Sequence, residues 1–239
     1  MRSRNRMPGY LAAAALLAAA CSSNGGVLPR AQKKPGKITL LGRSEQDMRS
    51  NWVKRGTTTP AAWAYDNGVI TSGGGDIVTR QTFRDFLLHV EWKEPYMPNA
   101  HGQGRGNSGV GLLGLYEIQV LDSYGIADPG RGDCGAVYDR SAPLVNACKP
   151  PLKWQTYDIL FRAPRFDADG KKVEDARVSV IQNGIVVQNN TDIPGVTGIA
   201  EGHHESPDPG PILLQDHGNK VSFRDIWIIP LPESGANHY

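Results

Sequence analysis

Short apolar runs that end at glycine or proline are the feature that most limits what this chain can fold into. The 239 residues include 28 glycines and 17 prolines, so turn-forming residues recur at short intervals. No window of about 11–18 residues places apolar side chains at helical spacing. Short strands separated by turn signals are typical of antiparallel sandwiches and jelly rolls. We therefore predict an all-β fold, a jelly-roll sandwich of two antiparallel sheets.

Segments with the two-residue period of a β-strand cover most of the chain. In residues 85–92, Leu87, His89 and Glu91 alternate with apolar residues that face the other way. Asn183-Gly184 is a strong two-residue hairpin signal between expected strands at 177–182 and 185–188. The other expected strands are 63–70 (with a turn signal at Asp66-Asn67-Gly68), 108–115, 116–121, 154–162, 212–214 and 221–229.

The N-terminus has the layout of a bacterial lipoprotein signal. Arg2, Arg4 and Arg6 precede an apolar run over 10–20 that is too short to span a membrane as a helix. Three alanines lead directly into Cys21, as in a lipobox, where the cysteine is lipidated and becomes the new N-terminus. An ordinary secretory signal with an incidental cysteine is the alternative. We expect a signal peptide at 1–20, a flexible tether at 21–37, one β-sandwich domain at 38–231 and a C-terminal tail at 232–239.

Removal of the signal peptide also removes the chain's apparent basicity. Residues 1–20 hold three arginines and no acidic residue, so the formal net charge changes from +2 to −1. A near-neutral chain gives no electrostatic case for a nucleic-acid partner. The expected location is the cell envelope, with a lipid-anchored domain that faces the periplasm or the cell exterior. The membrane, through the lipid, is an expected partner.

Two cysteines remain if Cys21 is lipidated. Cys134 and Cys148 have 13 residues between them, and an even pair in an oxidising compartment suggests a disulfide. Closing a loop of this length is worth about 3 kcal/mol. Two unpaired thiols are the alternative. Metal binding by the pair is disfavoured, because no second Cys or His pair follows at zinc-like spacing.

Residues 107–125 carry the most informative polar pattern. Glu117 and Gln119 share one face of an expected strand, and apolar Leu115 and Leu121 flank them on that face. An acid beside an amide on a concave sheet suits sugar hydroxyls, which need paired donors and acceptors. An ordinary surface strand with no function could show the same pattern.

The other candidates are histidines. His89 and Glu91 lie on the polar face of their strand, where a structural role is the common one. His217 follows Gln215 and Asp216, and a His beside an Asp in a turn serves as a general base, a metal ligand or a turn stabiliser. His203-His204-Glu205 lies in a Gly/Pro-rich loop without helical metal-site geometry, and residues 166–170 lack the rest of a calcium loop. Serine-hydrolase and nucleotide-binding motifs are absent from the sequence.

Five segments together resemble the 3-keto-disaccharide hydrolase domain family, formerly a domain of unknown function. This family is similar in fold to concanavalin-like lectins and family 16 glucanases. The chain departs from the family at 40–52, where the usual Phe-Asp-Gly-Lys type opening is missing, and Cys134 and Cys148 are not part of the general pattern. The matching segments are GGGDIVTRQTFRDFLLHVEWK (73–93), GNSGVGLLGLYEIQVLDSYG (106–125), 142–171, VSVIQNGIVVQNN (178–190) and GPILLQDHGNKVSFRDIWIIPL (210–231).

The resemblance implies a concave groove and action on 3-keto-glycosides, sugars already oxidised at the third carbon. The ketone acidifies the hydrogen on the second carbon, so a base can form an enolate that expels the group at the anomeric carbon, after which water adds. Such an enzyme needs a base, an acid and a group that holds the enolate oxygen. No cofactor is firmly indicated, and a divalent metal that polarises the ketone is left open. The expected catalytic residues are Glu117, His217 and His89, with Asp122 in support; the expected substrate-binding residues are Asn107, Gln119, Tyr138, Gln215 and Glu91.

A non-catalytic carbohydrate-binding lipoprotein is the alternative function, because sandwiches of this kind also serve as lectins. The polar face offers acid, amide and imidazole groups, whereas a binding face more often presents exposed aromatic rings. Trp92 and Trp227 fall on apparent core faces of their strands, which argues against such a platform. We therefore expect an enzyme. Tyr138 is included because GAVYDRSAP lies between two matching segments, and plain packing is its alternative role.

Overall fold

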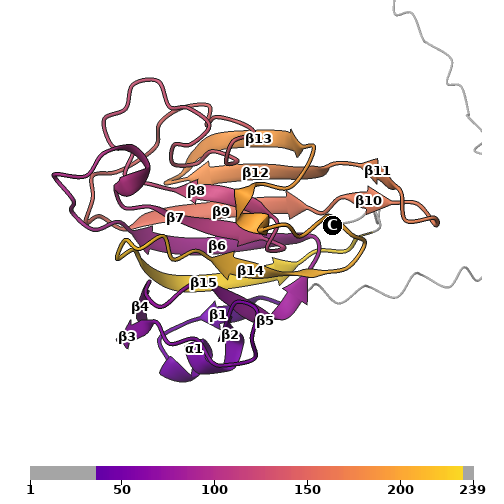
Figure 1. The fold of residues 1–239 in the computed structure, drawn as a ribbon, viewed down its shortest axis with the longest axis horizontal. Coiled ribbons are helices and arrows are strands. Elements are labelled where there is room, and N and C mark those ends of the chain that lie inside the picture. The colour runs from indigo at the N-terminus through magenta and orange to yellow at the C-terminus, as the bar shows by residue number, and fades with distance from the viewer. Residues whose placement is uncertain (1–35, 234–239) are drawn as a thin grey trace, which may run out of the picture. The chain divides into compact units, whose positions relative to one another are not determined.

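The computed structural model describes residues 36–233, which form fifteen strands, one α-helix and two short 3-10 turns (Figure 1). Eight strands make one sheet, here called the large sheet, in the order β13-β12-β9-β6-β15-β4-β3, with β1 also paired to β15. Its strands are β1 (Ile38–Leu41), β3 (Ala64–Asp66), β4 (Val69–Thr71), β6 (Phe86–Lys93), β9 (Gln155–Arg162), β12 (Ala176–Gln182), β13 (Ile185–Ile193) and β15 (Ser222–Pro230).

Five strands make a second sheet, here called the small sheet, in the order β2-β5-β14-β7-β8. They are β2 (Trp52–Lys54), β5 (Ile77–Phe83), β7 (Ser108–Leu112), β8 (Tyr116–Val120) and β14 (Gly210–Leu214). All pairings in both sheets are antiparallel, so the predicted jelly-roll sandwich of two antiparallel sheets is confirmed. β10 (Arg165–Phe166) and β11 (Lys172–Glu174) form a separate small hairpin.

The core lies between the inner faces of the two sheets. Tyr116 of β8 packs against Phe161 of β9 with ring centroids 5.6 Å apart, which joins the small sheet to the large one. Trp92 and Tyr157 stack at 4.0 Å, and both are fully buried. Burial of such large side chains contributes about 1.5–3 kcal/mol each and provides most of the stabilisation of the sandwich.

The expected hairpin turns are present. Asn183 and Gly184 both have positive φ values, 53° and 83°, as a type I′ turn requires. Asn67 and Gly68, with φ values of 48° and 86°, turn the chain between β3 and β4. The sequence therefore located two tight turns of the large sheet, because each turn needs residues that tolerate the left-handed conformation.

The position of Trp227 corrects one expectation. Trp227 does not face the core: it is half-buried on the outer face of the large sheet and stacks on His89 at 5.0 Å. A β-bulge shifts the register of β15 between Arg224 and Trp227, and Asp225 within it has a φ of 42°. The extra residue reverses the alternation that the sequence pattern assumes, so the side chains beyond it exchange faces.

One helix was missed. α1 (Glu45–Asn51) is capped at its N-terminus by Ser44, whose side chain accepts a hydrogen bond from the backbone N–H of Gln46. It has seven residues and buries only Met48, so it is too short to show helical periodicity. Figure 1 shows α1 grouped with β1–β4 at one side of the sandwich.

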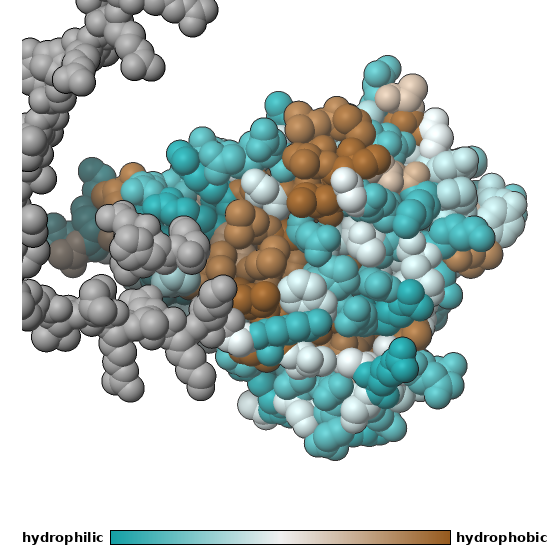
Figure 2. Space-filling view, turned by 180° about the vertical axis from the view of Figure 1, so that it is seen from behind, coloured by the Kyte–Doolittle hydropathy of each residue, from teal (hydrophilic) through white to brown (hydrophobic). Residues whose placement is uncertain are grey.

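The predicted signal peptide and Cys21 lie outside the described residues. Between residues 36 and 233, no helix has the length and apolar character needed to cross a membrane. Figure 2 shows apolar areas among polar ones on the side opposite the view in Figure 1. Exposed apolar residues on neighbouring strands of the large sheet include Leu160, Ile181, Ile185 and Val186.

The two remaining cysteines are free thiols, so the predicted disulfide is not present in the structure. The thiols are nevertheless neighbours: the amide of Gln182 donates to Cys134 Sγ at 3.5 Å and to Cys148 Sγ at 3.3 Å. Burial and a hydrogen bond with Cys148 raise the pKa of Cys134 well above its usual range. The fold alone therefore brings the pair together across the 135–147 loop.

Substitution of Ile159 tests the position of the core. Ile159 is fully buried on β9, so Ile159→Ala is expected to lower the free energy of unfolding by about 2–5 kcal/mol. Ile185→Ala is the matched control, because Ile185 is 47% exposed and its change should stay within about 0.5 kcal/mol. Urea unfolding measures both values. Equal losses in the two variants would contradict the assignment of Ile159 to the core.

Candidate active site

A small polar cavity of about 110 Å³ opens on the outer face of the small sheet. β8 supplies Glu117 and Gln119, and the segment after β14 supplies Gln215 and His217. Loops and the 3-10 turn η2 (Gly198–Ala200) complete its wall. Of the residues expected from the sequence, the cavity brings together Asn107, Glu117, Gln119, Tyr138, Gln215 and His217.

The alternation of β8 places the acid and the amide in this cavity. Tyr116, Ile118 and Val120 belong to the hydrophobic core, so the residues between them must point away from it. Gly109 on β7 leaves the room that Glu117 needs, since a Cβ there would lie 2.3 Å from Glu117 Oε1. Gly109, within the sequence N-S-G-V-G (107–111), thus leaves space for the acid on β8.

Glu117 is a buried carboxyl group with a raised pKa. Its side chain is 4% exposed, and burial, with the nearby negative charge of Asp76, raises its pKa to about 7. A carboxyl group with a pKa near the working pH suits a general base, because it is partly ionised and still accepts a proton readily.

The amide of Gln119 can lie in two orientations next to this acid. In one, its NH₂ group donates to Gln103 Oε1 at 3.0 Å and Asn107 Oδ1 at 3.3 Å, and its oxygen faces Glu117 Oε1. Two oxygens at 3.0 Å need a proton between them, so this orientation suits protonated Glu117. In the reverse orientation the NH₂ group donates to Glu117 Oε1 at 3.0 Å and the Ser108 carbonyl at 3.2 Å, which suits the ionised form.

Gln215 contributes an acceptor with no partner among residues 36–233. Its backbone is fixed on both sides, since its N–H donates to the Gly109 carbonyl at 3.0 Å and its carbonyl accepts from Ser108 Oγ at 2.7 Å. Its side-chain oxygen is buried and makes no hydrogen bond within those residues. An unsatisfied buried acceptor costs about 1–3 kcal/mol, which a bound hydroxyl group would recover.

His217 lies at the exposed rim of the cavity, on a turn that Asp216 holds. Asp216 accepts hydrogen bonds from the backbone N–H groups of Gly75 at 2.8 Å and Gly218 at 3.2 Å. Asp216 also donates its own N–H to Asp76 at 2.8 Å. Asp216 therefore stabilises the turn, while His217 is free to meet a ligand.

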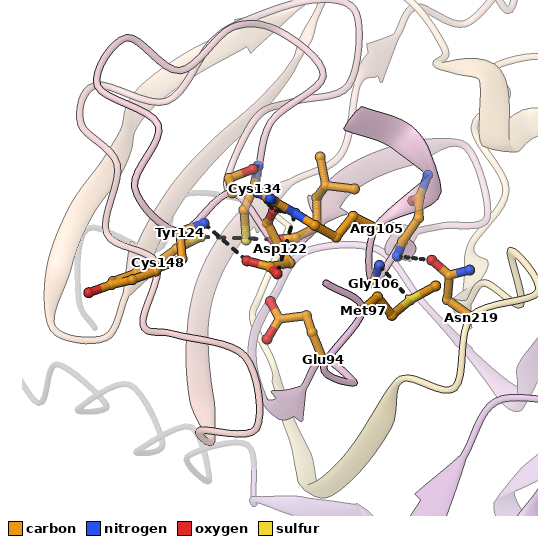
Figure 3. A network of polar contacts seen from close by, with 12 residues as sticks. Glu94, Met97, Arg105, Gly106, Asp122, Tyr124, Cys134, Cys148 and Asn219 are labelled. Carbon is orange, nitrogen blue, oxygen red and sulfur yellow. Dashed lines mark hydrogen bonds and ion pairs between the residues drawn. The ribbon is translucent and has the colours of Figure 1, made fainter. Parts of the chain in front are cut away.

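Asp122 supports the site from outside the cavity. It is nearly buried, and its carbonyl accepts two hydrogen bonds from the Arg105 guanidinium, at 2.9 and 2.6 Å, while its carboxylate accepts the N–H of Tyr124 at 3.2 Å (Figure 3). The segment fixed in this way includes Asn107, whose side chain donates to Gln103 at 2.7 Å. Asp122 thus positions the loop that carries the amides.

His89 and Glu91 are not part of this cavity, which corrects the expectation that they share a face with Glu117. They lie on the outer face of β6, in the large sheet. His89 Nδ1 is 2.7 Å from Asp158 Oδ1, and Glu91 pairs with Arg224 at 2.5 Å. Alternation along a strand identified their polar face correctly, but it does not tell which sheet the strand joins.

Possible metal ligands gather in a different place from the cavity. Within residues 36–233, His89, Glu91 and Asp225 have ligand atoms within 4.8 Å of one another, on the outer face of the large sheet. In the His203-His204-Glu205 loop, Glu205 accepts a hydrogen bond from Tyr116 and forms an ion pair with Lys172, each at 2.7 Å. The described geometry therefore assembles no three-ligand metal group at Glu117.

Sequence reasoning missed Gln103 and Ile199, which also line the cavity. Gln103 lies in the glycine-rich run H-G-Q-G-R-G, where the 3-10 turn η1 (Gly102–Gly104) holds it. A glutamine between glycines is a weak indication of a polar residue on an exposed loop near a site. Ile199 had none, because its place depends on how the 194–209 segment folds over the small sheet.

The comparisons with known proteins agree with this architecture. A family described as the 3-keto-alpha-glucoside-1,2-lyase-like domain matches residues 22–229. A crystal structure of a candidate glycosyl hydrolase from Parabacteroides distasonis has 40% identity and a TM-score of 0.74, with 82% of this chain and 84% of that chain covered. No match was found among curated proteins.

Two further candidate glycosyl hydrolases from Parabacteroides distasonis share the fold at lower identity. One is 22% identical with a TM-score of 0.55, over 82% of this chain and all of that one (100%). The other is 21% identical with a TM-score of 0.54, over 82% of this chain and 94% of that one. Since the family match spans most of the sequence and the first structure shares two fifths of its residues, the chain belongs to the 3-keto-alpha-glucoside-1,2-lyase-like domain family.

Proposed function

We propose that this protein cleaves the glycosidic bond of 3-keto-glycosides in the cavity around Glu117, by elimination followed by addition of water. Membership of the family and the likeness to a candidate glycosyl hydrolase support a glycosidase-like enzyme that acts on carbohydrate. The observation that carries the specific reaction is the buried carboxyl group of Glu117, whose pKa is raised to about 7. Elimination needs a base of this kind, whereas simple sugar binding does not.

Each step of the reaction can be assigned to a group at the cavity. Glu117 removes the proton from the second carbon, and the electron pair of that C–H bond forms an enolate with the neighbouring ketone. The amides of Gln119 and Asn107 line the same cavity, and on substrate binding they would exchange their hydrogen bonds to Gln103 for bonds to the enolate oxygen. The electrons then form a bond between the first and second carbons as the group on the first carbon leaves with its oxygen.

The remaining steps restore a saturated sugar. His217 at the rim gives a proton to the departing oxygen, so the leaving group is released as an alcohol. Water then adds its hydroxyl group to the first carbon and a proton to the second carbon. Glu117 releases its proton to solvent and His217 takes one up, which restores both groups. The side-chain oxygen of Gln215 accepts a hydrogen bond from a sugar hydroxyl, which satisfies its unpaired acceptor, and Tyr138 offers another hydroxyl partner.

Substitution at Glu117 and His217 tests these roles on a 3-keto-disaccharide and its unoxidised parent. Glu117→Gln keeps the shape of the side chain but removes the base, so kcat/KM on the keto substrate is expected to fall by about 10²–10⁴. His217→Ala is expected to lower kcat/KM by about 10². Release of free sugar measures both, with and without a chelator, because a loss on chelation would add a metal to the mechanism.

Glu174→Gln is the matched control, because Glu174 is exposed on β11 and does not line the cavity. Its activity should equal that of the unaltered protein. Cleavage of the unoxidised parent at the same rate would contradict the need for the ketone. Binding of both sugars without turnover would favour the carbohydrate-binding alternative.

The dependence on pH follows from the raised pKa of Glu117. As a base it must be ionised, so the rising limb of kcat/KM against pH should have its midpoint at about pH 7. Between about 4.5 and 7 the folded protein holds a proton that the unfolded chain has lost, so the free energy of unfolding should decrease as pH rises through that window. Glu94, whose pKa burial also raises to about 7, adds to this decrease. Urea unfolding at pH 5 and pH 8 should show a smaller difference for Glu117→Gln; an unchanged difference would contradict the assignment.

We further propose that the domain works at the cell envelope, anchored by a lipid on Cys21, and that the Cys134–Cys148 pair is oxidised there. The contact of both thiols with the Gln182 amide supports the pairing. Mass spectrometry of protein from its native compartment should show loss of residues 1–20, a diacylglycerol on Cys21 and loss of both thiol hydrogens. Retention of residues 1–20 would refute the anchor, and two free thiols would refute the disulfide.

A further inference from the structure

A second cavity, of about 350 Å³, lies on the same outer face of the small sheet as the Glu117 cavity. One row of paired residues crosses the sheet and connects the two. Glu117 pairs with Gly111, Gly111 with Leu213, and Leu213 with Val78. Residues directly opposite each other on neighbouring strands point to the same face. Leu213 therefore lies two strand spacings, or roughly 10 Å, from Glu117, and it lines the second cavity together with Val78.

The two cavities differ in chemistry. The Glu117 cavity is lined by amides and an acid, whereas the lining of the second cavity includes the apolar side chains of Val78, Leu115 and Leu213, here called its floor. Polar Arg55, Ser206 and Asp208 lie in the same lining. The rim of the second cavity carries the imidazoles of His203 and His204. The floor offers a flat apolar group a contact surface that the amides and the acid of the Glu117 cavity do not offer.

A single turn separates the two cavities. Ile199 in η2 lines the Glu117 cavity, and its Cδ1 lies over Gly111, 3.3 Å from the place of a Cβ there. Arg55, from the wall of the second cavity, donates to the Ile199 carbonyl at 2.7 Å. Arg55 also pairs with Asp76 and Glu201, each at 3.2 Å, so its charge is neutralised and does not make the cavity an anion site.

We propose that the second cavity holds the leaving group of the substrate, and that this group is aromatic. This inference rests on the proposed function, because it assumes that the oxidised sugar ring occupies the Glu117 cavity. The glycosidic oxygen then lies near Ile199, and the released phenol takes up one proton as the bond to the first carbon breaks. A phenol has a pKa of about 10, as the tyrosine side chain does, so it leaves with little help from an acid. For such a substrate the proton from His217 assists departure less than it does for an alcohol leaving group.

Val78→Asn tests the subsite, because Val78 is half-buried on its floor and is not part of the Glu117 cavity. The substrates are the phenyl and methyl glycosides of 3-keto-glucose, compared by kcat/KM. Loss of apolar contact with a ring is worth about 10–200-fold in kcat/KM, so the variant should lose about 10-fold or more on the phenyl substrate. Its activity on the methyl substrate should not change. Val173→Asn on β11, with Val173 57% exposed, is the matched control and should change neither value.

The outcomes separate the two proposals. Turnover of the methyl substrate by the unaltered protein supports the proposed function whatever the subsite does. Equal losses on both substrates, or no loss on the phenyl substrate, would overturn the subsite alone. Failure of the unaltered protein to cleave either keto substrate would overturn the proposed function and the subsite with it. Circular dichroism of each variant confirms that the fold is retained.

Discussion

The alternation of side chains along β8 is the constraint on which the site depends. Tyr116, Ile118 and Val120 are needed in the core, so Glu117 and Gln119 are forced to the opposite face. The burial of Glu117 then needs space, and Gly109 on the neighbouring strand provides it. A carboxyl group placed in this way loses hydration without gaining a cation, which favours its neutral form and raises its pKa. The alternation of side chains along β8 therefore determines both the packing of the core and the raised pKa of the base.

Asp76 connects Glu117 to the other parts of the cavity. Asp76 raises the pKa of Glu117 through its charge, and it also accepts the N–H of Asp216, which holds the turn that carries His217. Asp76 pairs with Arg55, which in turn fixes the Ile199 carbonyl. One half-buried carboxylate thus links the base, the rim imidazole and the turn that divides the two cavities. Removal of Asp76 would disturb all three, so the effect of its substitution would not isolate any one of them.

Local patterns in the sequence predicted the elements whose physics is local. Asn183-Gly184 specified a turn because both residues tolerate positive φ, and the alternation in β6 and β8 identified the polar faces correctly. The sheet to which each strand belongs is a long-range property, so His89 was grouped with Glu117 although the two lie on different sheets. The bulge at Asp225 turns Trp227 outward, and no residue type in 221–229 predicts a bulge at that position. Ile199 reaches the cavity only through the tertiary path of its loop.

The isotope content of the product tests the central claim most directly, namely that cleavage proceeds by proton removal from the second carbon and readdition from water. A 3-keto-disaccharide is cleaved in D₂O by the unaltered protein, and the released keto-sugar is analysed early by NMR and mass spectrometry, with the same sugar kept in D₂O without protein to measure spontaneous exchange. The account predicts one deuterium at the second carbon of each product molecule, well above that background. A product that keeps its original hydrogen there would contradict removal of that proton by Glu117 and its replacement from water.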